Sequence, residues 1–155
     1  MEQKALTARE QKVWESFQRL FANVLPRVAR EVEEVAGLSE AEFALLLHLN
    51  ARDGQVLLQQ EVANSLGWDK SRLSHLLTRM QKRMLVERIS LGSKGTTVAP
   101  TQAGKEALNL ALPAQGAAVR HLLIKRLTLD EALTLQELAE KTSIPNLGER
   151  TLQQP

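Results

Sequence analysis

Apolar residues recur every three or four positions over most of the chain, which is the spacing that places them on one face of an α-helix. The longest such pattern runs from Val13 to Val35 and ends before Gly37. It follows a capping box, in which the Thr7 side chain accepts a hydrogen bond from the first turn and Glu10 reaches back. The pattern predicts one long N-terminal helix with a wide apolar face.

Shorter helical patterns follow in the central part of the sequence. A second capping box, Ser39-Glu40-Ala41-Glu42, opens a helix that we expect to stop at Asp53-Gly54, before a short strand at 55–57. Residues 59–66 read as a brief helix that ends at Gly67. Asp69 is expected to N-cap a helix to about Met84, whose inner face is Leu73, Leu76, Leu77, Met80 and Met84.

The C-terminal part of the sequence is helical again. Thr101 caps a long helix that we expect to be interrupted by Pro113 and Gly116 and to continue to Leu127. A third capping box, Thr128-Leu129-Asp130-Glu131, opens a last helix.

The composition supports a mainly α protein, because helix-forming Leu, Ala, Glu, Gln and Arg are abundant and Tyr is absent. The 155 residues include no Cys, which excludes a disulfide framework and a Cys-ligated zinc site. The first residues lack the apolar core of a signal peptide, and no apolar run approaches the length of a membrane span. We therefore expect a soluble, cytoplasmic protein with no membrane partner.

Positive charge is concentrated in one segment of the chain. The net charge is only +2, but residues 69–105 hold eight basic residues and two acids, whereas acids exceed bases in the remainder. A basic block within an acidic protein indicates one surface that binds a polyanion such as nucleic acid.

Residues 59–78, which overlap the start of this basic segment, have the spacing of a helix-turn-helix. Ala63 is small enough for two helices to cross closely, and Gly67 permits the turn between them. The remaining packing positions are filled by Val62, Leu66, Leu73 and Leu76.

The outer face of the second helix carries residue types that contact phosphates and base edges. Its N-terminal end is expected to enter the major groove, with Arg72 and its neighbours nearest the base edges. Lys70, Arg79 and Lys82 are expected to hold phosphates. The predicted DNA-binding residues are Lys70, Ser71, Arg72, Ser74, His75, Thr78, Arg79, Lys82, Arg88 and Lys94.

A predicted hairpin after this helix turns the motif into a winged helix. Val86, Ile89 and Val98 flank the glycine-bracketed turn Gly92-Ser93-Lys94-Gly95, which predicts two short strands. Lys94, near the tip, is placed to reach the minor groove or an adjacent phosphate.

Four motifs together resemble the MarR family of bacterial transcription regulators: Leu66-Gly67-Trp68-Asp69-Lys70-Ser71-Arg72-Leu73-Ser74-His75, Leu77-Thr78-Arg79-Met80, Lys94-Gly95-Thr96 and Thr101-Gln102-Ala103-Gly104. The resemblance implies a mainly α fold with a small β-hairpin wing, in which a winged helix-turn-helix is joined to a helical dimerisation region. The expected parts are an N-terminal dimerisation helix at 1–37, the DNA-binding domain at 38–100, C-terminal dimerisation helices at 101–142 and a flexible tail at 143–155.

The resemblance also implies a function: a homodimer that binds a palindromic operator in double-stranded DNA and acts as a repressor. It further implies release from DNA by a small aromatic effector, often phenolic. Candidate ligand contacts are Trp14, Phe17, Phe21 and His48, although three aromatic residues at helical spacing are also typical of a core or a dimer interface.

Other classes of protein find less support in the sequence. His48, His75 and His121 are far apart and no two have i, i+4 spacing, so no metal site is expected. No nucleophile motif or phosphate-cradling loop is present, so we expect neither an enzyme nor a cofactor. Two alternatives stay open: a winged-helix dimer that acts as a protein-interaction module, and a DNA-binding protein that responds to no ligand.

Overall fold

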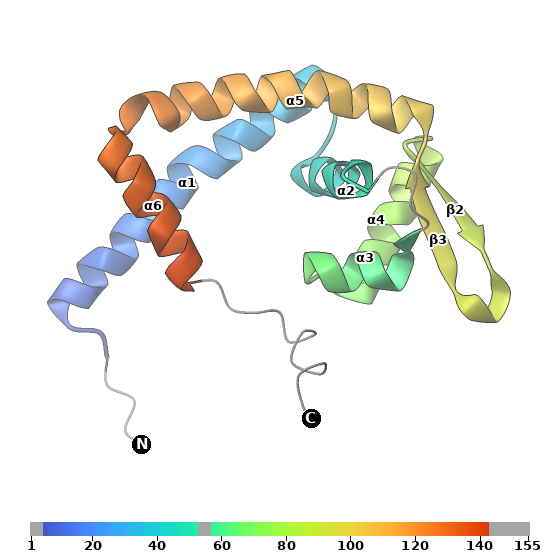
Figure 1. The fold of residues 1–155 in the computed structure, drawn as a ribbon, viewed down its shortest axis with the longest axis horizontal. Helices are drawn as coiled ribbons and strands as arrows, with labels where there is room; N and C mark the ends of the chain where they lie inside the picture. Colours follow the sequence, from blue (N-terminus) through green and yellow to red (C-terminus); the bar gives the residue numbers. More distant parts are fainter. Residues whose placement is uncertain (1–4, 53–56, 143–155) are drawn as a thin grey trace.

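The computed structural model describes residues 5–52 and 57–142, which are mostly helical (Figure 1). The expected helix stop at Asp53-Gly54 and the expected flexible tail lie outside these residues. The helices are α1 (Ala8–Ala36), α2 (Glu40–Asn50), α3 (Gln59–Leu66), α4 (Lys70–Lys82), α5 (Gln102–Leu122) and α6 (Leu129–Thr142). The strands are β1 (Leu57–Leu58), β2 (Val86–Ser90) and β3 (Thr96–Pro100), and two short 3₁₀ turns are η1 (Gly92–Lys94) and η2 (Ile124–Arg126).

Helix starts follow the capping signals in the sequence. The Thr7 backbone N–H donates to the Glu10 carboxylate at 2.7 Å, and the Thr128 N–H donates to Glu131 at 2.8 Å. The same reciprocal box begins α2, and Thr101 accepts from the third residue of α5. The three capping boxes predicted from sequence are therefore confirmed.

The molecule has two parts, joined by its two longest helices. Helix α5 packs along α1, and α6 turns back across α1 at the end remote from the sheet (Figure 1). At the other end α2, α3 and α4 pack with the small sheet. The hydrophobic core lies mainly in this second part and is made of Leu38, Leu45, Leu46, Leu49, Val62, Leu73, Leu77, Met80, Val86 and Val98, with Val32 and Leu108 from the long helices.

The three strands form one antiparallel sheet in the order β1-β3-β2. Val98 of β3 stands opposite Leu57 on one side and Arg88 on the other. β2 and β3 extend beyond β1 as the expected hairpin, whose tip is η1 (Figure 1). The winged helix-turn-helix fold predicted from sequence is confirmed.

Two expectations about helices are wrong. Helix α5 is continuous through Pro113 and Gly116 to Leu122, and only a 3₁₀ turn follows it. Pro113 has no N–H, so the Asn109 carbonyl lacks its partner within the helix. Both residues are exposed, so water can donate a hydrogen bond to this carbonyl. Met84 does not belong to the inner face of α4, because the helix ends at Lys82 and the Met84 side chain is 72% exposed.

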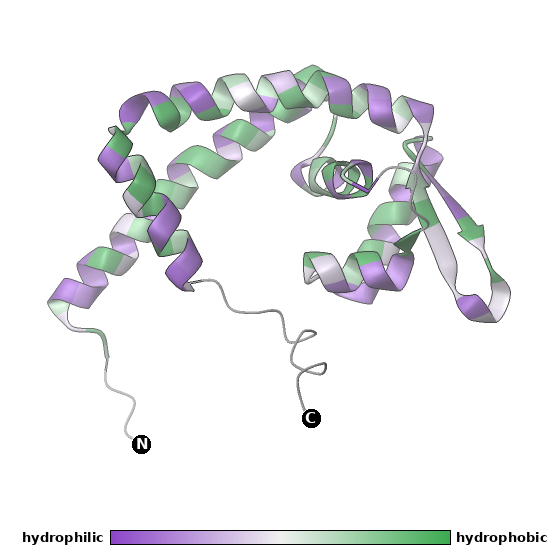
Figure 2. Cartoon of the chain, viewed as in Figure 1, coloured by the Kyte–Doolittle hydropathy of each residue, from purple (hydrophilic) through white to green (hydrophobic). Residues whose placement is uncertain are grey.

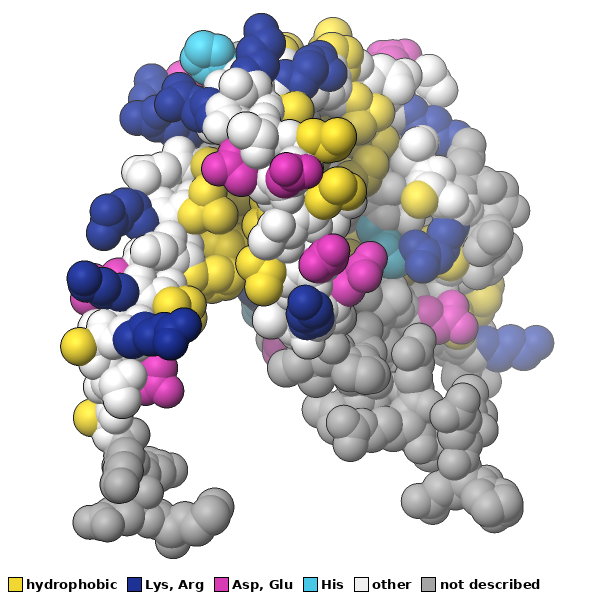
Figure 3. Space-filling view, turned by 60° about the vertical axis from the view of Figure 1, so that its left-hand side comes forward, with side chains coloured by type: hydrophobic (Ala, Val, Ile, Leu, Met, Phe, Trp, Pro, Cys, Tyr) yellow, Lys and Arg dark blue, Asp and Glu magenta, His cyan; other side chains and the backbone are white. Residues whose placement is uncertain are grey.

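Large apolar side chains remain exposed along α1 and α6. Figure 2 shows apolar positions repeating along both helices, and Figure 3 shows hydrophobic side chains gathered in a hollow with Lys and Arg on its outer edge. Those on α1 include Val13, Trp14, Phe17, Leu20, Phe21 and Leu25, and those on α6 are Leu129, Leu133 and Leu138.

Candidate nucleic-acid interface

The helix-turn-helix consists of α3, α4 and the turn between them. Gly67 has a φ of +64°, and the Trp68 N–H donates to the Ala63 carbonyl at 2.9 Å, which closes α3. An L side chain is strained at this φ, so the turn favours glycine. The packing positions named from sequence are buried at Val62, Ala63, Leu73 and Leu76 and half-buried at Leu66.

Helix α4 turns its apolar side to the core and its polar side to solvent. Its first turn is fixed by the Asp69 carboxylate, which accepts from the Ser71 and Arg72 amides at 2.8 and 3.0 Å. Of the ten predicted DNA contacts, eight are exposed, and Ser74 and Arg88 are half-buried. α4 therefore presents eight of the ten predicted contacts on its polar side, and the other two, Arg88 and Lys94, lie in β2 and η1.

Arg72 is the best-oriented basic side chain near the start of α4. Its guanidinium lies over the Trp68 ring, 5.5 Å from the ring centroid, while Trp68 packs against the core. A cation over an aromatic face is held there by the ring quadrupole. The Trp68 ring therefore supports the Arg72 guanidinium in the region expected to meet base edges.

Thr78 and Arg88, which are also predicted to contact DNA, are hydrogen-bonded to each other. The Arg88 guanidinium donates to the Thr78 hydroxyl at 3.2 Å and to Gln81 at 2.9 Å. The Thr78 hydroxyl donates its only hydrogen to the Ser74 carbonyl at 2.9 Å. In the free protein Thr78 therefore supports Arg88, and both link α4 to strand β2.

Lys70 lies next to the wing, and Lys94 lies at its tip. A hollow of about 220 Å³ separates the starts of α3 and α4 from the hairpin, and Lys70 lines it together with Gln59 and Thr96. Lys94 is exposed within η1, between Gly92 and Gly95, which both have positive φ. Lys70 therefore lines the hollow between helix and wing, whereas Lys94 lies at the wing tip.

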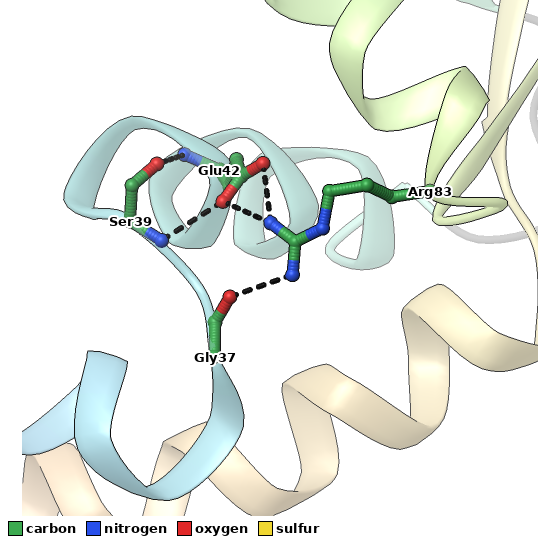
Figure 4. Close-up of polar contacts among 4 residues, drawn as sticks. All are labelled: Gly37, Ser39, Glu42 and Arg83. Carbon is green, nitrogen blue, oxygen red and sulfur yellow. Dashed lines mark hydrogen bonds and ion pairs between the residues drawn. The ribbon is translucent and has the colours of Figure 1, made fainter.

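Arg83, one of the eight basic residues of segment 69–105, pairs with an acidic residue of α2. From the end of α4 its guanidinium donates to both carboxylate oxygens of Glu42 at 2.8 Å and to the Gly37 carbonyl at 2.7 Å (Figure 4). Glu42 is buried, and the pKa of its carboxyl is below the ordinary value: burial raises it, but hydrogen bonds from Ser39 and Arg83 more than offset this. Sequence reasoning missed this pair.

The four candidate ligand contacts do not gather in one place. Trp14 and Phe17 stack with ring centroids 5.7 Å apart and line an open groove of about 730 Å³ near the start of α1. The ring centroids of Phe21 and Phe17 are 4.4 Å apart, and Phe21 lines a separate apolar hollow with Leu123 and other residues.

His48 lies in the winged-helix part, away from both hollows. One ring nitrogen is 2.9 Å from the Ser65 hydroxyl, and the Arg52 guanidinium is 3.1 Å from the ring. Burial lowers the pKa of His48, and the positive charge of Arg52 lowers it further. Within residues 5–52 and 57–142, no three His, Asp or Glu side chains form a group that could hold a metal ion.

Solved structures of known proteins share this architecture. AbsC, a MarR family transcriptional regulator from Streptomyces coelicolor, is 25% identical and has a TM-score of 0.80, with 90% of this chain and 95% of AbsC covered. Sco3205, a MarR family regulator from the same organism solved in complex with DNA, is 29% identical with a TM-score of 0.81, covering 90% and 88% of the two chains. The chain therefore shares the fold of these MarR family transcriptional regulators over 90% of its length.

Residues 37–96 match a family model described as a domain of unknown function, DUF7343. CouR from Rhodococcus jostii RHA1, solved with p-coumaroyl-CoA, shares the MarR fold at 20% identity and a TM-score of 0.72, with 90% and 97% of the chains covered. No curated protein matches the sequence. No helix within the described residues is long and apolar enough to cross a membrane.

Proposed function

We propose that this protein is a dimeric, sequence-specific DNA-binding regulator of transcription that acts as a repressor. The observation that carries the proposal is the exposed face of α4, on which Arg72, Arg79 and Lys82 stand opposite a fully packed apolar side. Side chains of these types bind base edges and phosphates. The DNA complex of Sco3205 supports the same use of the fold here.

Dimerisation is supported by the apolar side chains left exposed on α1 and α6. Trp14 and Phe17 are each about half exposed, and Leu129 is 76% exposed. A monomer seldom leaves so long an apolar face in water, and a two-fold dimer buries the same face of both copies. We therefore assign residues 8–36 and 102–142 to the dimer interface and expect a dimer in sedimentation at micromolar concentration.

Two recognition helices related by a two-fold axis meet successive major grooves on one side of the duplex. The half-sites are expected about 10 base pairs, or roughly 34 Å, apart, and the operator is an inverted repeat. If the dimer neutralises about six phosphates, log K falls against log salt with a slope near −5.

The test is selection of duplexes from a random library, followed by salt titration of the selected sequence. An inverted repeat with a steep salt slope supports the proposal. A slope near zero contradicts DNA binding and leaves the protein-interaction module as the function. A steep slope without a preferred sequence leaves a non-specific DNA-binding protein.

Release by a small aromatic effector is part of the proposal and rests on the family resemblance. The MarR-fold protein CouR was solved with an aromatic acyl-CoA. We assign Trp14, Phe17 and Phe21 first to the dimer interface, since they form one exposed aromatic row on α1. Addition of a panel of phenolic acids to the protein–operator complex tests release, and no effect from any of them favours the ligand-independent alternative.

A further inference from the structure

The end of the recognition helix is attached to both helices of the proposed dimer interface. On one side, the Arg83 guanidinium bonds the carbonyl of Gly37, the residue that ends α1. On the other side, the Thr101 N–H, at the start of α5, donates to the Leu85 carbonyl at 3.1 Å. Arg83, Met84 and Leu85 thus lie between α1 and α5.

The attachment to α1 depends on the Arg83 side chain. Its guanidinium makes three short charge-assisted bonds, two to Glu42 and one to Gly37 (Figure 4). Glu42 is itself fixed, because its side chain is 8% exposed and accepts from the Ser39 N–H at 2.9 Å. A planar guanidinium held by two partners at once restrains both distance and orientation, which an ammonium group does not.

Three observations exclude simpler roles for Arg83. It is half exposed, so its bonds are not required merely to neutralise a buried arginine. Its guanidinium points to the α1–α2 junction and not to the polar face of α4 (Figure 4). Its partners are 41 and 46 residues away, so it does not serve local helix capping.

We propose that Arg83 is a positioning residue that fixes helix α4 relative to the dimerisation helix α1 and thereby sets the half-site spacing that the dimer accepts. This inference rests on the proposed function, because spacing has meaning only for a DNA-binding dimer. Without Arg83, α4 keeps its apolar packing in the core and the Leu85–Thr101 hydrogen bond, but loses its bond to the end of α1.

The experiment uses the full chain and the inverted repeat selected by the wild-type protein. Affinities are measured for that repeat, for repeats with one or two base pairs added or removed between half-sites, and for a single half-site. Each added base pair moves the second half-site by about 3.4 Å along the duplex and rotates it around the axis. The wild-type protein is expected to lose at least about tenfold in affinity for each altered spacing.

Arg83→Met is expected to weaken binding of the selected repeat about tenfold and to level the affinities across the spacing series, within the 5–150-fold range typical of coupling between sites. Affinity for the single half-site is expected to change by less than about threefold, since α4 itself is intact. Arg83→Lys keeps the charge but not the double attachment, so it is expected to level the series as well. Glu42→Gln removes a negative charge instead of a positive one, and it is also expected to level the affinities across the spacing series.

Arg52→Met is the matched control. Arg52 follows α2 and lies outside the proposed dimer interface; its guanidinium is 3.1 Å from the ring of His48, four residues earlier, so the variant loses the same charge and a local contact without disconnecting two elements. It is expected to keep the wild-type spacing preference. Circular dichroism establishes that each variant is folded, and Arg83→Lys and Glu42→Gln carry the test should Arg83→Met not fold.

Folded Arg83 variants with the wild-type spacing preference would overturn the inference, even with a lowered Tm. An equal loss on the half-site and the full repeat would also overturn it, because Arg83 would then be a phosphate contact. If the wild-type protein selects no inverted repeat, the proposed function itself has failed, and the inference fails with it.

Discussion

Gly104 lies directly against the carbonyl oxygen of Leu85, where α5 passes the junction between α4 and β2. A Cβ at position 104 would stand 2.1 Å from that oxygen, closer than any real contact allows. The obstacle is backbone, and the adjoining Thr101 N–H bonds the same carbonyl. Only glycine lets α5 approach the recognition helix this closely.

We therefore expect Gly104→Ala to destabilise the protein by about 1–3 kcal/mol, the usual cost of an overpacked core. The matched control is Gly116→Ala in the same helix, where the added Cβ would meet only the Arg120 guanidinium at 3.4 Å. A helix-interior Gly→Ala change of this kind is expected to stabilise by up to about 1 kcal/mol. Urea unfolding of both variants measures the difference, and equal stabilities would contradict the close approach.

Met84 carries backbone strain that a glycine would remove. It is the one non-glycine residue with positive φ, at 57°, among the described residues, and the Leu85 N–H bonds the Met80 carbonyl around it. This left-handed position after a helix usually holds glycine. The exposed Met84 side chain contributes little packing, so Met84→Gly is expected to raise the free energy of unfolding by about 1 kcal/mol. A lower Tm for this variant would show that the side chain is needed.

Arg72 and Lys82 are expected to affect DNA binding differently. Arg72, held over Trp68 near the start of α4, is placed for base edges, whereas Lys82 ends the helix. Arg72→Ala is expected to cost about 1–3 kcal/mol at one operator position and to relax base preference there. Lys82→Ala is expected to weaken all duplexes alike and reduce the salt slope by about 1. Competition assays with single-base operator variants separate the two, and uniform weakening by Arg72→Ala would contradict its assignment.

Acid is expected to destabilise the contact between α2 and α3 through His48. Because the pKa of His48 is below its ordinary value of 6.5 in the folded protein, the unfolded chain binds the proton more readily. The free energy of unfolding therefore decreases as the pH falls below 6.5. Urea unfolding at pH 7.5 and 5.5 is expected to show that the free energy of unfolding falls less between these two pH values in His48→Asn than in the wild type.

His121→Asn is the matched control for this measurement, because it removes an exposed histidine outside the winged-helix part. It is expected to follow the wild-type pH dependence. If His48→Asn also kept the wild-type pH dependence, this would contradict the loss of stability at low pH assigned to the His48 ring beside Arg52 and Ser65.

The features that could be predicted from sequence are those fixed by neighbours within a few residues. Thr7 with Glu10, and Asp69 with the amides that follow it, form hydrogen bonds across a single helical turn. The turn at Gly67 and the buried Ala63 are likewise read from spacing within one motif. These local signals gave the helices, the wing and the exposed face of α4.

The features that were missed depend on residues that are distant in sequence or on solvent. Glu42 is recognisable as half of a capping box, but nothing near it indicates that Arg83, 41 residues later, needs its charge. The pairing arises only when α2 and α4 pack together. Pro113 was expected to interrupt α5, yet Asn109 is exposed, so water can donate a hydrogen bond to the Asn109 carbonyl that Pro113 leaves without an amide partner.

The N-terminal half of α1 is exposed at every described position before Val24. A helix that packs against so little is only marginally stable in water, and in the proposed dimer a second copy would cover it. For such a dimer, mass action predicts that helix content and Tm rise with protein concentration. A subunit made in small amounts would then be the more open to proteases, and the lifetime of the protein in the cell would increase with its own abundance.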